Sequence, residues 1–178
     1  MRTSREGIFW IAGREALVLV AYHDGENEDG SLRYSIGFGD NSAKAGDKID
    51  PKTAWQRLVA NIRQREKIVN KHLKKPVTQD QYDSIMEAYY QGGTRNLLPL
   101  AAAVNAGEAD KIPEILPLLD TNKSGEHKPG LKIRREASAR IAQYGDYGTL
   151  FPIKLYRGDP RKTKPVEYYA SGEDVDEI

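Results

Sequence analysis

The chain has 178 residues, a net charge of +1, no cysteine and three histidines. This length suits one domain with a single hydrophobic core, and the small net charge disfavours strong nucleic-acid binding. Without cysteine there is neither a disulfide framework nor a thiolate zinc site, and the scattered histidines lack ligand spacing, so we expect no metal centre. No stretch approaches the roughly 20 apolar residues of a membrane span, so we expect no stable membrane insertion.

Charge is distributed unevenly along the chain. Residues 166–178 contain five acidic and no basic residues, so residues 1–165 carry +6. A mildly basic body suits a polyanionic target such as a bacterial cell wall, and a solvated surface of mixed charge explains the pattern equally well. The apolar run near the N-terminus is short and is interrupted by Gly13, Arg14 and Glu15, so we expect no signal peptide.

Residues 14–40 combine carboxylates, a glycine-rich turn and a hydroxyl within a short span. Glu15 precedes the apolar run 17–21, which predicts that it lies near the end of a buried helical segment. Asp24 stands where that helix is expected to stop, because turn-forming residues follow it. Residues 34–39 alternate bulky and small side chains, which predicts a short strand. Two carboxylates in unlike surroundings are what acid/base chemistry on a glycosidic bond requires.

The middle of the chain predicts a series of helices. An Asp-Pro pair precedes apolar residues at helical spacing, which predicts one long amphipathic helix over residues 51–73. The sequence Thr-Gln-Asp-Gln at 78–81 is a capping box, and it begins a second helix that ends at the paired glycines 92–93. An alanine-rich segment predicts a further helix over about 97–105.

The last third of the chain changes in composition. Two prolines divide residues 108–120 into short helical pieces, and a polar loop follows. Residues 131–144 predict a last helix, and the candidates for its inner side are Ile133, Ala137, Ile141 and Tyr144. Residues 147–178 contain three prolines and an acidic end, which predicts an extended or strand-like segment and then a disordered terminus.

These motifs together resemble the phage-type lysozymes (endolysins), a family of muramidases that cleave bacterial peptidoglycan. The family signature has a Glu on the first helix, a Tyr seven positions on, an Asp nine positions on, and a Thr or Ser before Ile-Gly-aromatic-Gly. The matching residues here are Glu15, Tyr22, Asp24, Ser35 and residues 36–39. The segments QDQYDSIMEAYYQGG, LLPLAAAVNAGE and GLKIRREA resemble the family's central helix, the leucine-rich stretch after it and the start of its last helix.

The resemblance implies a lysozyme-like α+β fold that is mostly helical, with a small N-terminal β-hairpin lobe, a larger helical lobe and an active-site cleft between them. It implies a catalytic domain over residues 1–145 and a C-terminal extension over residues 146–178. The implied enzyme is a glycoside hydrolase that cleaves the β-1,4 bond between N-acetylmuramic acid and N-acetylglucosamine without a cofactor.

The resemblance also implies roles for single residues. Glu15 is the expected general acid, since burial at the end of an apolar helix favours its protonated form. Asp24 is expected to stay ionised, and Ser35 to hold the attacking water with it. The simpler alternatives are a surface Glu, a helix-stop Asp and a cross-strand serine that satisfies backbone groups. Arg135, or Arg134 beside it, is the expected substrate-site arginine, which would anchor the Glu15 carboxylate.

Three features depart from the family pattern. The loop between Asp24 and Ser35 is longer than the usual short turn, so Asp29 is an alternative to Asp24 as the residue that faces the cleft. Ser35 stands where many members have Thr, which keeps the hydroxyl. Asp40 stands where many members have His, so no role of that His can be transferred.

Other functions stay open at this point. A lytic transglycosylase keeps the acid Glu but forms an anhydro sugar without water, and the presence of both Asp24 and Ser35 favours hydrolysis. A catalytically inactive virion or wall-binding protein would keep the fold alone. We expect a monomer that acts on peptidoglycan and does not bind nucleic acid. It would wait in the host cytoplasm before release to the wall, or be packaged in the virion through residues 146–178.

Overall fold

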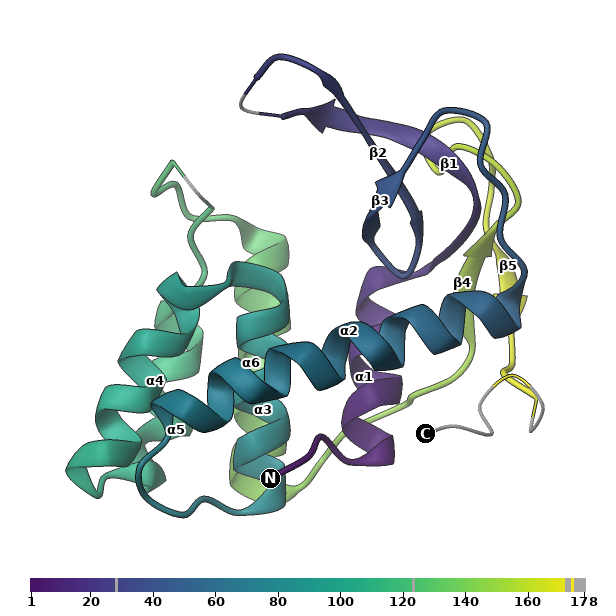
Figure 1. Cartoon of the computed structure of the whole chain (residues 1–178). Coiled ribbons are helices and arrows are strands. Elements are labelled where there is room, and N and C mark those ends of the chain that lie inside the picture. Colours follow the sequence, from purple (N-terminus) through teal and green to yellow (C-terminus); the bar gives the residue numbers. More distant parts are fainter. Residues whose placement is uncertain (28, 123, 172–173, 175–178) are drawn as a thin grey trace. The chain divides into compact units, whose positions relative to one another are not determined.

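The chain forms two compact units in the computed structural model, which describes residues 1–27, 29–122, 124–171 and 174 (Figure 1). The helical unit consists of Met1–Ile8 and Ile62–Gly148, and the sheet unit of Phe9–Asn61 and Thr149–Ile178. Helices α1 (Arg5–Glu15) and α2 (Pro51–His72) contribute residues to both units. The predicted α+β, mostly helical fold class is confirmed. None of the described helices is long and apolar enough to span a membrane.

The sheet unit contains a five-stranded sheet in the order β3-β2-β1-β4-β5. Antiparallel pairing joins β1 (Leu17–Glu26), β2 (Leu32–Gly37) and β3 (Asp40–Ala43). On the other edge of β1, β4 (Ile153–Tyr156) runs parallel to it, and β5 (Val166–Tyr168) pairs antiparallel with β4. The C-terminal segment that we predicted to be strand-like therefore completes the sheet. Most of the acidic end that we predicted to be disordered lies outside the described residues.

Residues 17–21 form the start of β1, so the helical segment predicted there is wrong. Ala16 has a φ of 58°, in the left-handed region, and α1 ends directly before it at Glu15. The apolar Leu-Val-Leu-Val sequence pairs with β2 on one edge and with β4 on the other, and this tertiary pairing overrides the local preference. Asp24 consequently lies on a strand and not in a turn after a helix.

An aromatic cluster around Trp55 forms part of the largely aliphatic core of the sheet unit. Trp55, which is 1% exposed, contacts Phe9 edge to face at a centroid distance of 5.5 Å and Phe38 at 4.6 Å. Phe9 also contacts Phe151 at 5.0 Å, and the Trp55 indole N–H donates to the Tyr168 hydroxyl at 3.0 Å. Because Phe151 and Tyr168 belong to the C-terminal extension, that extension is part of this core.

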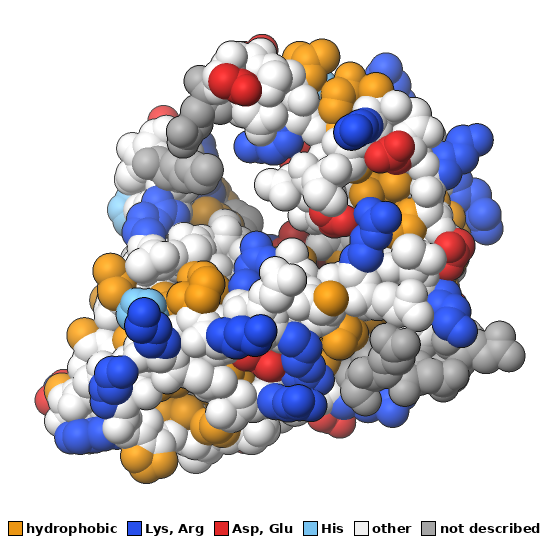
Figure 2. All heavy atoms as spheres, viewed as in Figure 1, with side chains coloured by type: hydrophobic (Ala, Val, Ile, Leu, Met, Phe, Trp, Pro, Cys, Tyr) orange, Lys and Arg blue, Asp and Glu red, His pale blue; other side chains and the backbone are white. Residues whose placement is uncertain are grey.

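The helical unit is built from helices that follow the predicted order. Its elements after α2 are α3 (Gln79–Gly92), α4 (Thr94–Ala106), η1 (Ala109–Lys111), α5 (Ile112–Ile115), η2 (Leu116–Leu118) and α6 (Pro129–Tyr144). The predicted capping box is confirmed, because the Thr78 hydroxyl accepts from the Gln81 backbone N–H and the Gln81 side chain accepts from the Thr78 N–H. Lys and Arg side chains are spread along the course of α2 (Figure 2).

The inner face of α6 agrees with the predicted one at Ile141, which is buried as expected, and differs from it at two other positions. Ile133 and Tyr144 are 64% and 71% exposed. The buried residues are Arg135, Ser138, Ala139 and Ile141. Arg135 and Ser138 both bind the carboxylate of Glu87 on α3, so the buried side of α6 combines polar contacts with the apolar residues Ala139 and Ile141.

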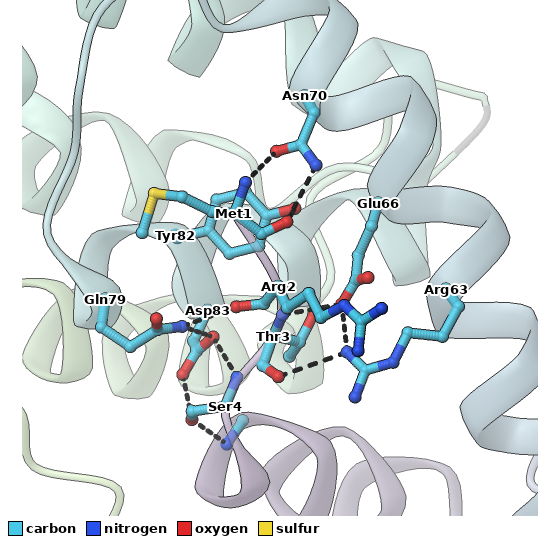
Figure 3. A network of polar contacts seen from close by, with 11 residues as sticks. Met1, Arg2, Thr3, Ser4, Arg63, Glu66, Asn70, Gln79, Tyr82 and Asp83 are labelled. Carbon is cyan, nitrogen blue, oxygen red and sulfur yellow. Dashed lines mark hydrogen bonds and ion pairs between the residues drawn. The ribbon is translucent and has the colours of Figure 1, made fainter. Parts of the chain in front are cut away.

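The N-terminus belongs to the helical unit through a network of polar contacts (Figure 3). The Thr3 backbone N–H donates to the Glu66 carboxylate on α2 at 2.7 Å. The Ser4 backbone N–H donates to Asp83 on α3 at 3.0 Å, and the Ser4 hydroxyl donates to the same carboxylate. The Tyr147 hydroxyl adds a hydrogen bond of 2.6 Å to Asp83. Despite these donors, burial raises the pKa of Asp83.

Candidate active site

Glu15 is the last residue of α1, and its carboxylate faces the turn between β2 and β3. A Cβ placed on Gly39 would lie 3.3 Å from Glu15 Oε2, and the φ of Gly39 is 77°. Glycine at this position therefore provides both the space and the backbone conformation that the close approach needs. Glu15 is half-buried whereas Asp24 is exposed, so the two carboxylates do have unlike surroundings.

Asp24 and Ser35 lie on neighbouring strands and share a hydrogen bond. The Ser35 hydroxyl donates to Asp24 Oδ2 at 2.8 Å, and Ser35 is only 3% exposed. Tyr22 is the cross-strand partner of Ser35, and Asp24 follows it by two positions, which puts all three side chains on one face of the hairpin. A carboxylate and a hydroxyl held in this way can orient one water molecule between them.

Asp29 has a different role from Asp24. One of its carboxylate oxygens accepts from the Ser31 hydroxyl at 2.6 Å and from the Ser31 backbone N–H at 2.9 Å. These hydrogen bonds, the side-chain one above all, lower the pKa of Asp29. Asp29 thus closes the turn of the long loop, and Asp24 is the acidic residue that the structure joins to Ser35.

Tyr22 lies within electrostatic reach of both carboxylates. Burial is the main cause that raises the pKa of the Tyr22 hydroxyl, and the charges of Asp24 and Glu15 raise it further. The guanidinium group of Arg161 acts in the opposite direction. Within the sheet unit, Tyr22 thus lies opposite Ser35 and interacts electrostatically with Asp24 and Glu15.

Arg135 lies in the helical unit and is fully buried. Its guanidinium group donates to Glu87 and to the Gln91 side chain, and Arg134 also donates to Glu87. Burial by itself would raise the pKa of Glu87, but the two guanidinium groups outweigh it and hold the pKa below its usual range. These contacts make Arg135 a structural ion-pair residue of the helical unit. Its predicted contacts with substrate and with Glu15 stay predictions.

The helical unit also contains an open pocket of about 590 Å³. Among the residues that line it are Tyr89, Tyr90 and Gln91 at the end of α3, which the sequence did not assign to a site. The Arg65 guanidinium lies 4.6 Å from the centre of the Tyr90 ring. Helical spacing favours a core role for such tyrosines, and the polar Gln-Gly-Gly sequence after them is the signal that marks the open end of the helix.

The model of the phage lysozyme family matches residues 12–138 of this chain. The chain belongs to the phage lysozyme family. It is therefore a glycoside hydrolase of the lysozyme type, and its substrate is peptidoglycan. The matched range contains Glu15, Asp24, Ser35 and Arg135, whereas β4 and β5 lie outside it.

Solved structures agree with this membership. The endolysin from Escherichia coli O157:H7 phage FAHEc1 is 30% identical, with a TM-score of 0.71 over 84% of this chain and 98% of its own. The P1 phage endolysin Lyz is 20% identical, with a TM-score of 0.69 over 82% of this chain and 86% of its own. The muramidase domain of SpmX from Asticaccaulis excentricus is 22% identical, with a TM-score of 0.62 over 80% of this chain and 97% of its own. The latter two show the fold alone. No curated protein sequence gives a significant match.

Proposed function

We propose that the enzyme hydrolyses the β-1,4 bond between N-acetylmuramic acid and N-acetylglucosamine during phage lysis or infection. The observation that carries this proposal is the hydrogen bond from Ser35 to Asp24, beside the half-buried Glu15. Glycoside hydrolysis needs two carboxylic groups in different environments and a positioned water. Glu15 and Asp24 are suited to be the two carboxylic groups, and the Asp24–Ser35 pair is suited to position the water.

In the proposed reaction, Glu15 gives its proton to the glycosidic oxygen while the bond from that oxygen to the anomeric carbon breaks. The positive charge that develops on the sugar ring is stabilised by the Asp24 carboxylate. Ser35 fixes Asp24 and, with it, orients the water whose oxygen bonds to the anomeric carbon. The proton that this water releases passes by way of Asp24 and solvent to Glu15, which regenerates the enzyme. The products are one chain with a new reducing N-acetylmuramic acid end and one chain with a new non-reducing N-acetylglucosamine end.

A lytic transglycosylase is the alternative within the same fold, because it keeps the acid residue but uses no water. The Asp24–Ser35 pair supports hydrolysis, since a reaction without water has no use for a pair that orients one. Mass spectrometry of digested wall distinguishes the two reactions. We expect reducing N-acetylmuramic acid ends, and anhydro ends as the main product would reject the hydrolase proposal.

The role of Glu15 is tested by Glu15→Gln in a zymogram with embedded peptidoglycan. We expect the variant to lose activity by about 10²-fold or more, the usual contribution of a general acid, with an unchanged melting temperature. Asp29→Asn is the matched control, because it changes an exposed carboxylate of the same unit that only closes a turn. If Glu15→Gln clears the wall as well as wild type, the assignment is wrong, and if wild type clears nothing, an inactive wall-binding protein is the better description.

A further inference from the structure

The connection between β4 and β5, residues 157–165, is an exposed basic segment of the sheet unit. It contains four basic residues and one acidic residue, and all four basic side chains are exposed. Leu155 and Tyr156 of β4 pair in parallel with Leu17 and Val18 of β1. Since parallel strands run in the same direction, the chain that leaves β4 continues toward the part of β1 that carries the candidate site. This segment lies outside the range that matches the family.

Arg161 is the residue of this segment that reaches the site. Its guanidinium carbon lies 5.8 Å from the centre of the Tyr22 ring, and 57% of its side chain is exposed. The hydrogen bonds from Arg161 to Asp159 are the main cause that raises the pKa of Arg161, and the negative charge of Asp24 raises it further. The guanidinium group thus lies close enough to the candidate catalytic residues to act on the same substrate.

Asp159 holds Arg161 in place. The Asp159 carboxylate accepts from Arg161 Nε at 3.0 Å, from Nη2 at 2.8 Å and from the Arg161 backbone N–H at 2.9 Å. A guanidinium group has five N–H donors, and this fork uses two of them. Within the described part of the chain the other three have no hydrogen-bond partner. An arginine that is held by one carboxylate and exposed on its remaining side is preorganised to bind a second carboxylate.

We propose that Arg161 is a specificity-determining residue that binds a carboxylate of the peptide stem on the N-acetylmuramic acid next to the scissile bond. This inference rests on the proposed muramidase function. The sugar rings carry no charge, and in an N-acetylmuramic acid that bears a stem the lactyl carboxyl is tied up in the amide bond to the peptide. The carboxylates of the stem are then the anionic groups available to a cation beside Tyr22. Charge-assisted binding there favours glycan strands that carry peptide stems with free carboxylates.

The test compares two wall substrates that differ only in stem charge. Both are peptidoglycan freed of phosphate-bearing polymers and N-acetylated at their amines, and in one of them the stem carboxylates are then converted to neutral amides. Wild type and Arg161→Gln are assayed for kcat/KM on each. Arg157→Gln is the matched control, because Arg157 is an exposed arginine of the same segment. Arg161→Lys, which keeps the charge but not the fork, is the second variant.

We expect Arg161→Gln to lower kcat/KM on the charged wall by about tenfold, mainly through KM, the order of one charge-assisted contact. On the amidated wall we expect Arg161→Gln and wild type to be equal. Arg157→Gln should match wild type on both walls, and Arg161→Lys should fall between wild type and Arg161→Gln on the charged wall.

Several results would overturn this inference while leaving the muramidase proposal intact. An equal loss on both walls would show that Arg161 supports the site structurally, and an equal loss for Arg157→Gln would show only a general effect of charge. Unchanged kinetics of Arg161→Gln on the charged wall would remove the role altogether. If wild type cleaves neither wall, the muramidase proposal itself fails.

Discussion

The helical unit and the sheet unit differ in their buried charges, because every charged residue that is buried in the described part of the chain belongs to the helical unit. In the helical unit, Glu87 and Arg135 are fully buried and paired, and Asp83 is buried among donors. In the sheet unit the buried residues are almost all apolar, and Asp24 lies exposed with a hydrogen bond to the Ser35 hydroxyl. A buried ion pair whose hydrogen bonds are all made within the protein fixes the packing of helices but cannot contact a substrate. An exposed carboxylate with a single hydrogen-bond partner can contact one. The difference separates charges that stabilise from charges that can react.

Substitutions at the Asp24–Ser35 pair of the sheet unit are expected to have the largest effect, and this effect is on catalysis. We expect Asp24→Asn and Ser35→Ala each to lower kcat/KM on peptidoglycan by about 10²-fold, and the double variant to lose little more, because both residues act on one water. Melting temperatures should stay within a few degrees of wild type, roughly the effect of 1 kcal/mol or less. Losses that multiply in the double variant would show that the two residues act independently.

The second prediction concerns the stability of the helical unit. Glu87→Ala leaves the guanidinium groups of Arg134 and Arg135 without their shared buried carboxylate, so we expect a loss of about 3–5 kcal/mol in the free energy of unfolding. Urea denaturation measures it. Glu136→Ala changes an exposed glutamate of α6 and should stay within about 0.5 kcal/mol of wild type. A small loss for Glu87→Ala would contradict the structural role of this pair.

The third prediction tests whether the C-terminal extension belongs to the core of the sheet unit. Leu155 is 4% exposed on β4, and we expect Leu155→Ala to cost about 2–5 kcal/mol in the free energy of unfolding. Lys154→Ala, on the exposed side of the same strand, should be nearly neutral. Equal, small effects would mean that the extension can be removed without harm. A large loss for Leu155→Ala would show that the extension contributes to the core. Deleting the extension would then remove core packing in addition to any function in binding a partner.

The smallest expected effect is on the pH dependence of stability. The folded-state pKa of Glu87 is lowered, so its contribution is present above about pH 4.5, its ordinary pKa, and is lost on acidification. The folded-state pKa of Asp83 is raised, so its contribution is fully present below about pH 3.8 and is lost as pH rises. On acidification Glu87→Gln should therefore lose stability less steeply than wild type, and Asp83→Asn more steeply. Parallel curves from pH 7 to 3 for all three proteins would contradict both assignments.

The elements predicted correctly are those set by neighbours in the sequence. The capping box at Thr78 and the helix that begins at Pro51 depend on contacts within a few residues, and both agree with the structure. The candidate residues Glu15, Asp24 and Ser35 came from a motif. The structure joins Asp24 to Ser35 by a hydrogen bond and places the Glu15 carboxylate beside Gly39. Their catalytic roles stay predictions.

The sequence by itself determined the family, the helical segments and the residue types at the candidate site, because motif spacing and capping are local properties. Tertiary structure alone decided three further points. Residues 17–21 became strand because β2 and β4 offer partners on both edges. Arg135 and Ser138 came to lie on the buried face of α6 because the desolvated Glu87 carboxylate needs hydrogen-bond donors. Arg161 came to lie beside Tyr22 because β4, remote in sequence, pairs in parallel with β1.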